Sequence, residues 1–391
     1  MASNLKGRLS RLRDSEKKRA RAEAVKSTDR ARPDFLEAWD EAGELVWTRS
    51  LCYPNPLPPS IDPEPFAPLR RQGRSSGSES LAVSRIAAER LRFFDLETTG
   101  LSGGTGTIAF LASVGKVAEN GLFSLSQVFL EDFPGEGNFV GIVLGLLGAQ
   151  PVVVSYNGKA FDLPLLHTRC VMTGNPLPSY AQVDALFAAR RLWRRVHGGS
   201  SLGLIESEVL GIDRGADLPG AMIPEVWLAF AKGEHNPLMS LVLSHNASDV
   251  VGLAKIVARI ASVFEAPLSY AESIDIDRAG LGRTLLSVGR QEEGEALLDA
   301  AARSGDVRAA ALLFHRFRLT FRPDEALSLD AFLPESYHAA IERAKLYERS
   351  RRNMDEAMRW ANEAQLRARS ERERAEARRR IERLARKSER R

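Results

Sequence analysis

Cysteine is nearly absent from this chain, which has only Cys52 and Cys170 among its 391 residues. Two cysteines are too few for a disulfide framework or a cysteine zinc site, and such scarcity is typical of a reducing cytoplasm. No apolar run approaches the 18 residues that a membrane-spanning helix needs. The start, Met1 to Lys6, lacks the apolar stretch of a secretion signal. We therefore expect a cytoplasmic protein without a membrane segment.

Charge is distributed unevenly along the chain. The formal net charge is only +4, but residues 1–32 carry +7 and residues 343–391 carry +9, so the residues between them carry −12. Basic ends around an acidic middle suit a polyanionic partner that meets a cation-binding centre. The same charges also fit solvated helical faces, and charge alone favours this simpler interpretation.

The length of 391 residues exceeds what one core usually organises, which predicts two globular domains. We expect residues 1–80 to form a basic N-terminal arm and a linker. Residues 1–32 are polar and basic, and residues 33–50 have enough apolar side chains to dock as a short amphipathic segment. Residues 53–80 are rich in proline and then in arginine, glycine and serine, which is typical of a linker or an irregular strap.

A different pattern begins at residue 91. Apolar, β-prone runs separated by short turns predict antiparallel strands at residues 91–97, 107–117 and 122–131. A further strand is expected at residues 151–156, and helices are expected at residues 138–149, 161–173, 180–195, 201–211, 223–232 and 236–264. This order predicts an α/β domain over residues 81–266, in which helices flank a mixed sheet.

After residue 270 the strand pattern stops. Small and large residues from Leu281 to Ala301, and more loosely from Ala344 to Ala364, fall at helix–turn–helix positions that resemble tetratricopeptide repeats. We therefore expect residues 270–391 to form an all-α helical-repeat domain, which could hold a protein partner. Its end, residues 365–391, is a basic Arg/Glu-rich helix with almost no apolar face, so we expect a solvated helix or tail.

Three acidic motifs follow one another in the α/β region. They are Asp95-Leu96-Glu97 on a strand, Asn157 to Asp162 at a strand-to-helix junction, and His245 to Asp249 within a helix. Strand side chains alternate between faces, so Asp95 and Glu97 project from the same side. Two carboxylates so placed repel each other unless a cation lies between them, and hard oxygen ligands suit Mg²⁺ or Mn²⁺.

The joint occurrence of these motifs resembles the DEDD superfamily of ribonuclease H-like 3′–5′ exonucleases. Over residues 91–264 the chain is most similar to the bacterial YprB-type ribonuclease H-like family, through Phe94 to Leu101, Tyr156 to Pro164, Arg190 to Trp193, Ser201-Leu202, His245-Asn246 and Asp249. The resemblance implies a ribonuclease H-like fold and hydrolysis of phosphodiester bonds with two Mg²⁺ or Mn²⁺ ions.

The resemblance also assigns roles to residues. It implies that Asp95, Glu97, Asp162 and Asp249 hold the two ions, with Asp95 bridging both. It further implies that Thr98 and Leu101 lie where the terminal nucleotide binds.

His245 lies four residues before Asp249, so the two share a helical face. A neutral imidazole there could accept a proton from the attacking water. The histidine subclass of the superfamily has its histidine five residues before the aspartate, whereas the spacing of four belongs to the tyrosine subclass. A role as general base, in a metal shell or in the structure therefore stays open.

Four further features have two interpretations each. Asn157 and Lys159 could bind nucleic-acid phosphate, or they could form a plain turn with an exposed lysine. Asp184 could add to the acidic group, although a helix cap is the favoured interpretation. Arg190, Arg191, Arg194 and Arg195 around Trp193 could bind phosphates and stack on bases, or they could be the solvated face of a helix.

The sequence thus predicts a metal-dependent nuclease, specifically a 3′–5′ exonuclease that acts on DNA or RNA. The alternative is a nucleic-acid-binding or adaptor protein with a catalytically weak ribonuclease H-like domain and partner-binding helical repeats. The choice between DNA and RNA, and between cutting from an end and cutting internally, is left open by the sequence.

Overall fold

The computed structural model describes residues 33–67, 85–100, 105–234, 236–273 and 275–389. The expected arm at residues 1–32, the Arg/Gly/Ser-rich stretch at 70–80 and Leu101 lie outside these described residues.

A seven-stranded mixed sheet forms the centre of the molecule, in the order β1-β2-β7-β6-β5-β8-β9. The strands are β1 (Asp40–Gly43), β2 (Val46–Tyr53), β5 (Leu91–Thr98), β6 (Ala109–Val117), β7 (Phe123–Leu130), β8 (Val152–Ser155) and β9 (Ala181–Asp184). β1, β2, β7, β6 and β5 pair antiparallel in turn, whereas β5, β8 and β9 run parallel. The mixed sheet expected from the sequence is therefore confirmed. Its parallel strands end at one edge, where polar groups of the following loops can meet.

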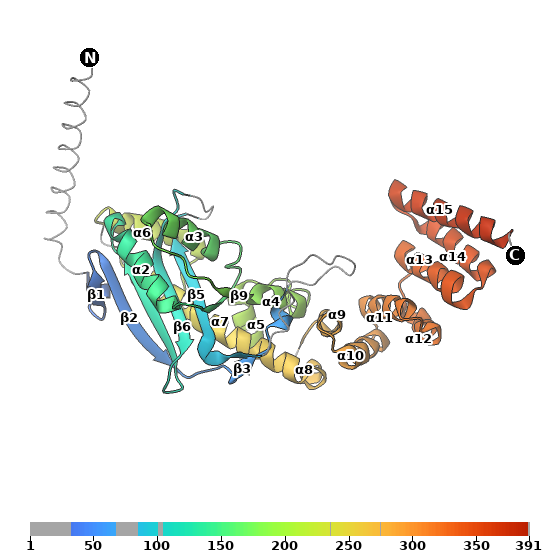
Figure 1. The fold of residues 1–391 in the computed structure, drawn as a ribbon, viewed down its shortest axis with the longest axis horizontal. Coiled ribbons are helices and arrows are strands. Elements are labelled where there is room, and N and C mark those ends of the chain that lie inside the picture. The colour runs from blue at the N-terminus through green and yellow to red at the C-terminus, as the bar shows by residue number, and fades with distance from the viewer. Residues whose placement is uncertain (1–32, 68–84, 101–104, 235, 274, 390–391) are drawn as a thin grey trace, which may run out of the picture.

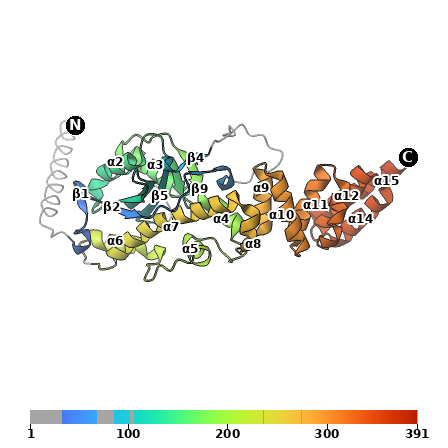
Figure 2. The ribbon, with the colours of Figure 1, turned by 90° about the horizontal axis from the view of Figure 1, so that it is seen from below.

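Helices cover both faces of this sheet (Figures 1 and 2). They are α2 (Glu136–Leu147), α3 (Asp162–Thr173), α4 (Ala185–Leu192), α5 (Leu202–Leu210), α6 (Ile223–Ala231), α7 (Met239–Glu265) and α8 (Pro267–Ser273). On β5, Phe93 packs in the core that includes most of α7, and Phe94 packs in the core that includes α2 and α3. Gly115 of β6 lets α7 approach closely, because a Cβ there would lie 2.8 Å from Val250 Cγ1. The face of β5 that carries Asp95 and Glu97 is thus the face that α7 covers.

Two segments differ from their expected secondary structure. Within residues 33–50, Leu36 and Trp39 dock in the core as expected. The segment then continues as a strand, because β2 pairs along its whole length with β7, from Val46↔Leu130 to Tyr53↔Phe123. Residues 180–195 are not one helix, because Val183 pairs beside Val154 in β9 before α4 begins. In both segments, pairing with a neighbouring strand sets the conformation.

The Pro-rich residues 53–67 form a strap against the body. The strap contains β3 (Ser60–Ile61), which pairs with β4 (Ile86–Ala87), and a short helical turn at Glu64–Phe66. Ile61 and Phe66 are buried in the same core as Phe93. These two apolar side chains explain why a proline-rich stretch lies against the sheet domain.

An all-helical region follows α8 and extends away from the sheet (Figure 1). Its helices are α9 (Arg278–Ser287), α10 (Gln291–Arg303), α11 (Val307–Leu319), α12 (Pro323–Ser328), α13 (Tyr337–Leu346), α14 (Met354–Arg367) and α15 (Glu371–Ser388). α9 and α10 approach closely at Gly282, where a Cβ would lie 2.7 Å from Leu298 Cγ. The helical character of this region is confirmed, whereas its likeness to tetratricopeptide repeats and the domain boundaries stay predictions.

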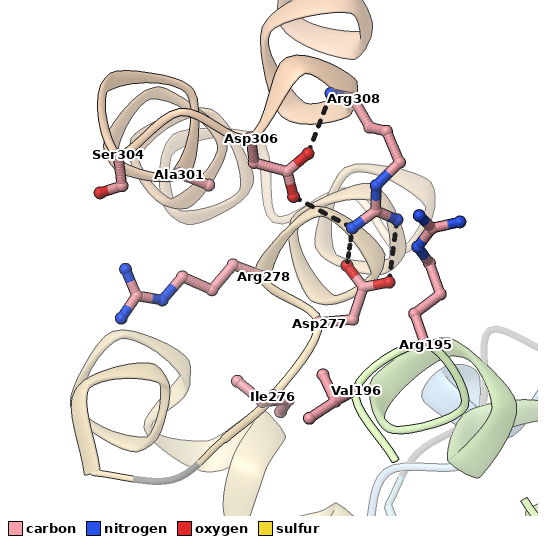
Figure 3. Close-up of a pocket in the computed structure, with 9 residues that line it drawn as sticks. All are labelled: Arg195, Val196, Ile276, Asp277, Arg278, Ala301, Ser304, Asp306 and Arg308. Atoms are coloured by element: carbon pink, nitrogen blue, oxygen red, sulfur yellow. Dashed lines mark hydrogen bonds and ion pairs between the residues drawn. The ribbon is translucent and has the colours of Figure 1, made fainter. Parts of the chain in front are cut away.

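The helical region is fixed to the sheet domain at the end of α4. The amide of Asp277 donates to the carbonyl of Leu192 at 2.7 Å. The Asp277 carboxylate accepts hydrogen bonds from Nη1 and Nη2 of Arg308, each at 2.9 Å. Figure 3 shows this pair at the wall of a cavity of about 290 Å³, with Arg195 beside it and Arg278 pointing to another side. Bidentate pairing of this kind holds α9 and α11 in one orientation at the junction.

The last helix, α15, differs from the solvated tail that the sequence predicts. Its Ala377 and Leu384 are buried against the neighbouring helices. Glu348, whose side chain is 1% exposed, binds Arg380 at 3.0 Å and Lys387 at 2.8 Å, and it also binds Arg383. Few apolar residues therefore suffice to hold α15 against its neighbours, because one buried carboxylate pairs with three cationic side chains of α15.

Replacing this carboxylate tests how α15 is held. Burial alone raises the pKa of Glu348, but Lys387 and Arg383 outweigh it and lower the pKa below its usual value. Its contribution to stability is therefore present above about pH 4.5 and is lost as the pH falls. We expect Glu348→Gln to lower the free energy of unfolding by about 1–3 kcal/mol and to increase hydrogen exchange in α15. Glu382→Gln, at an exposed position of α15, is the control, and equal effects of the two changes would contradict this account.

Candidate metal centre

Four carboxylates from three elements gather at the end of β5. Asp95 and Glu97 lie on β5, Asp162 is the first residue of α3, and Asp249 lies on α7. Burial raises the pKa of Asp95 well above its ordinary value, and the nearby charges of Asp249, Asp162 and Glu97 raise it further. The three sequence motifs thus meet at one place.

Asp95 is held by a buried polar network. Asn246 of α7 donates from Nδ2 to Asp95 Oδ2 at 2.7 Å. Asn246 Oδ1 accepts from Ser113 Oγ at 2.5 Å and from Gln127 Nε2 at 3.2 Å. Ser113, Gln127 and Asn246, which we call the Asn246 network, are all 0% exposed. Because two donors occupy Oδ1, the amide can only turn its Nδ2 toward Asp95.

A tight turn after β8 positions Asp162. Asp184, at the end of β9, accepts the backbone amide of Asn157 at 2.9 Å and caps α4 by accepting the amide of Leu186 at 3.0 Å. The cap expected for Asp184 is therefore confirmed. Asn157 has a positive φ of 68°, which asparagine tolerates. Gly158 follows because a Cβ there would lie 2.5 Å from Ser155 Cβ and 2.8 Å from Asp162 Oδ2.

Asp249 lies in a set of charged groups that the sequence motifs did not indicate. Arg214 is 2.5 Å from Asp249 Oδ1 and also 2.5 Å from Oε2 of the buried Glu206. His245 Nδ1 is 2.7 Å from Asp217 Oδ1, and its Nε2 is 3.5 Å from Asp249 Oδ2. Arg214 and Asp217 come from the loop between α5 and α6, where nothing in the local sequence pattern marks them as site residues.

The donor set fits divalent cations. Burial raises the pKa of Asp162 to about 7, and it also raises the pKa values of Glu97 and Asp249. One ligand atom from each of Glu97, His245 and Asp249 lies within 4.8 Å of the others, a separation that one ion could span. Crowded, partly desolvated carboxylates repel one another unless positive charge is supplied. Oxygen-rich ligands of this kind suit Mg²⁺ or Mn²⁺.

The described residues expected to contact nucleic acid lie at the end of β5 and on the turn that precedes Asp162. Thr98 Oγ1 donates to the carbonyl of Gly100 at 2.8 Å, at the end of β5. Lys159 is exposed on the turn that precedes Asp162. Their contacts with nucleic acid, and that of Asn157, stay predictions.

The proposed arginine patch is corrected in part. Trp193 is 0% exposed, so it cannot stack on a base. Arg191 is turned to the strap, where its guanidinium donates to the carbonyls of Pro65 and Ala67. Arg194 and Arg195 are exposed, as is Arg190, so phosphate binding by these three stays a prediction.

Comparison with known proteins defines the class. A sequence model of the RNase_H superfamily, most of whose members hydrolyse phosphodiester bonds, matches residues 92–261. This range spans all three acidic motifs. No helix in the described part of the chain is long and apolar enough to cross a membrane.

A relative covers more of the chain. The protein is 30% identical over 357 residues to the uncharacterized protein YprB of Bacillus subtilis (strain 168), and the match covers 84% of each chain. The chain therefore belongs to one family with this Bacillus protein, and its residues 92–261 form a domain of the RNase_H superfamily. The ribonuclease H-like fold that the sequence predicts is thereby confirmed.

The crowding of carboxylates predicts a pH dependence of stability without metal. The pKa of Asp162 is about 7 in the fold against an ordinary 3.8, so folding favours its protonated form. That contribution is complete below about pH 4 and is lost as the pH rises through about 7. In EDTA, we expect thermal melts between pH 5 and 8 to lose stability more steeply for the native sequence than for Asp162→Asn. Equal slopes would contradict the raised pKa.

The Asn246 network can be tested by removing its central amide. Asn246→Ala removes the buried amide that bonds to Asp95, Ser113 and Gln127, so we expect the free energy of unfolding to fall by about 1–3 kcal/mol. Denaturant unfolding in EDTA measures this loss. The control is Asn362→Ala, at an exposed position of α14. A loss no larger than that of the control would contradict the role of the network.

Proposed function

We propose that the protein is a metal-dependent nuclease, most specifically a 3′–5′ exonuclease that hydrolyses phosphodiester bonds in DNA or RNA. The observation that carries the proposal is the meeting of Asp95, Glu97, Asp162 and Asp249 at one end of β5, in a chain of the RNase H superfamily. The superfamily supports phosphodiester hydrolysis, whereas the 3′–5′ direction rests on the resemblance of the three motifs to DEDD exonucleases.

The reaction places negative charge where the four carboxylates gather. The oxygen of a water molecule bonds to phosphorus, the bond from phosphorus to the 3′-oxygen breaks, and that oxygen leaves with a proton. Two bound Mg²⁺ or Mn²⁺ ions would supply stabilisation of the attacking and leaving oxygens. In this proposal Asp95, whose Oδ2 is held by Asn246, would bind both ions, and Glu97, Asp162 and Asp249 would hold them with it.

Other residues would bind the strand. Asn157 and Lys159 lie on the turn that leads into Asp162, and Thr98 ends the strand that carries Asp95 and Glu97. We propose that these residues contact the terminal nucleotide and its phosphates, together with Leu101. Arg190, Arg194 and Arg195 offer further exposed positive charge for a polyanion.

A binding protein with a relic site is a weaker candidate. Buried carboxylates that repel one another cost stability, and a protein that no longer binds metal would gain by losing them. Asp95 has instead kept a fully buried network that fixes its orientation. The two free cysteines, one exposed and one buried, fit a reducing compartment, so we propose that the enzyme acts in the cytoplasm.

Two single substitutions test the proposed function. We expect Asp95→Asn and Asp162→Asn each to lower Mn²⁺-dependent hydrolysis by about a thousandfold or more, which corresponds to about 4 kcal/mol of activation free energy. The loss follows because each change removes a charge that the ions require. The measurement is a product ladder from 5′-labelled single- and double-stranded DNA and RNA.

The control is Asp324→Asn, because the Asp324 side chain is 82% exposed and pairs with Arg351 in the helical region. Circular dichroism checks that each variant is folded. Full activity in both site variants would reject the nuclease assignment. A ladder of internal cuts would keep the nuclease and reject only the exonuclease.

A further inference from the structure

The two ring nitrogens of His245 have different surroundings. Nδ1 is 2.7 Å from Asp217 Oδ1, a normal hydrogen-bond distance. The Asp217 carboxylate also accepts the amide of Leu218 at 2.8 Å and pairs with Arg214 at 3.3 Å. These partners favour an anionic Asp217 that can only accept, so Nδ1 carries the proton. The lone pair of a neutral His245 is then on Nε2.

Nε2 is turned to the Asp249 carboxylate. It is 3.5 Å from Asp249 Oδ2, longer than an ordinary hydrogen bond, and ligand atoms of Glu97, His245 and Asp249 all lie within 4.8 Å of one another. A lone pair that faces carboxylate oxygens is unfavourable unless a cation lies between them. The ligand atoms of the three groups therefore converge on one place.

The other oxygen of Asp249 is already used. Asp249 Oδ1 is 2.5 Å from Arg214 Nη2, and the same nitrogen is 2.5 Å from Glu206 Oε2. Glu206 is 2% exposed and lies against α7 at Gly252, where a Cβ would be 1.5 Å from Glu206 Oε1. A glycine in the middle of a helix is destabilising by about 0.5–1 kcal/mol, and here it makes room for the carboxylate. This arrangement leaves Oδ2 as the oxygen of Asp249 that is turned to His245.

We propose that His245 is a metal ligand positioned by Asp217, so that one ion site of the centre is a mixed site of Glu97, His245 and Asp249. The inference rests on the proposed function and changes its ligand set, which otherwise contains carboxylates alone. An imidazole ligand suits Mn²⁺ and similar transition metals better than Mg²⁺, which prefers oxygen. A ligating histidine that donates its second nitrogen to a carboxylate is a recurrent arrangement in metal proteins.

Another histidine in the chain provides a matched comparison. His315 Nδ1 is 2.8 Å from Glu342 Oε2, much as His245 is from Asp217. Around this second pair lie the cations Arg318 and Lys345, each within 2.7 Å of Glu342. The metal-ligand group found among the described residues includes His245 and does not include His315. The pairing of a histidine with a carboxylate is thus shared, whereas the converging carboxylates are particular to His245.

The test is electron spin-echo spectroscopy of Mn²⁺ bound to the full-length protein, combined with calorimetric titration. We expect the native sequence to show a ¹⁴N coupling from a bound imidazole, and His245→Gln to lose it. His245→Gln and Asp217→Asn should weaken Mn²⁺ binding by about 10–100-fold, with a much smaller effect on Mg²⁺. His315→Gln should keep both the coupling and the affinity.

The outcomes separate this inference from the proposed function. Saturable Mn²⁺ binding and hydrolysis without a ¹⁴N coupling in the native protein would overturn the ligand role and leave the nuclease intact. This readout needs no variant, so misfolding cannot obscure it. Absence of saturable binding of either ion to the native protein would overturn the inference and the metal centre together.

Discussion

Repulsion between like charges is the constraint on which this molecule depends. The fold brings carboxylates from β5, α3 and α7 to one end of the sheet, where burial and mutual repulsion raise their pKa values. Such an arrangement opposes folding unless positive charge is supplied. His245 and Arg214 lie beside Asp249 and offset part of the rise in its pKa. In the proposed function, bound metal ions would supply the rest of the positive charge, and they would join the architecture to the chemistry of phosphodiester hydrolysis.

The polar groups around the centre explain how the carboxylates keep their places. The Asn246 network holds Asp95 through the amide of Asn246. The network continues to Arg49 of β2, which donates to Gln127 Oε1 at 2.7 Å. Asp184 holds the turn before Asp162. Each support comes from an element other than the one that carries the ligand, so the geometry of the centre depends on the whole sheet domain. Supports of this kind are needed where ligands must be held within fractions of an ångström.

The sequence predicted what has a local pattern. Apolar, β-prone runs between short turns predicted the strands around Asp95, and the helical period placed His245 and Asp249 on one face of a helix. The prediction that these motifs meet in space came from their resemblance to a known superfamily. No local rule brings together residues that are 154 positions apart in sequence, as Asp95 and Asp249 are.

What escaped prediction depends on contacts between distant segments. The residues of β2 were expected to belong to the arm and linker, because their strand conformation depends on pairing with the distant strand β7. Arg214 and Asp217 look like ordinary loop residues until α7 places His245 and Asp249 beside them. α15 looked solvated because one buried carboxylate, Glu348, replaces the apolar face that the helix lacks.

The most direct test of this account is the anomalous scattering of a crystal grown with Mn²⁺. The account predicts two strong peaks at the end of β5, both in contact with the Asp95 carboxylate and each bound by further groups from Glu97, Asp162 and Asp249. A map with no peak among these carboxylates, at Mn²⁺ concentrations that support hydrolysis, would contradict the central claim.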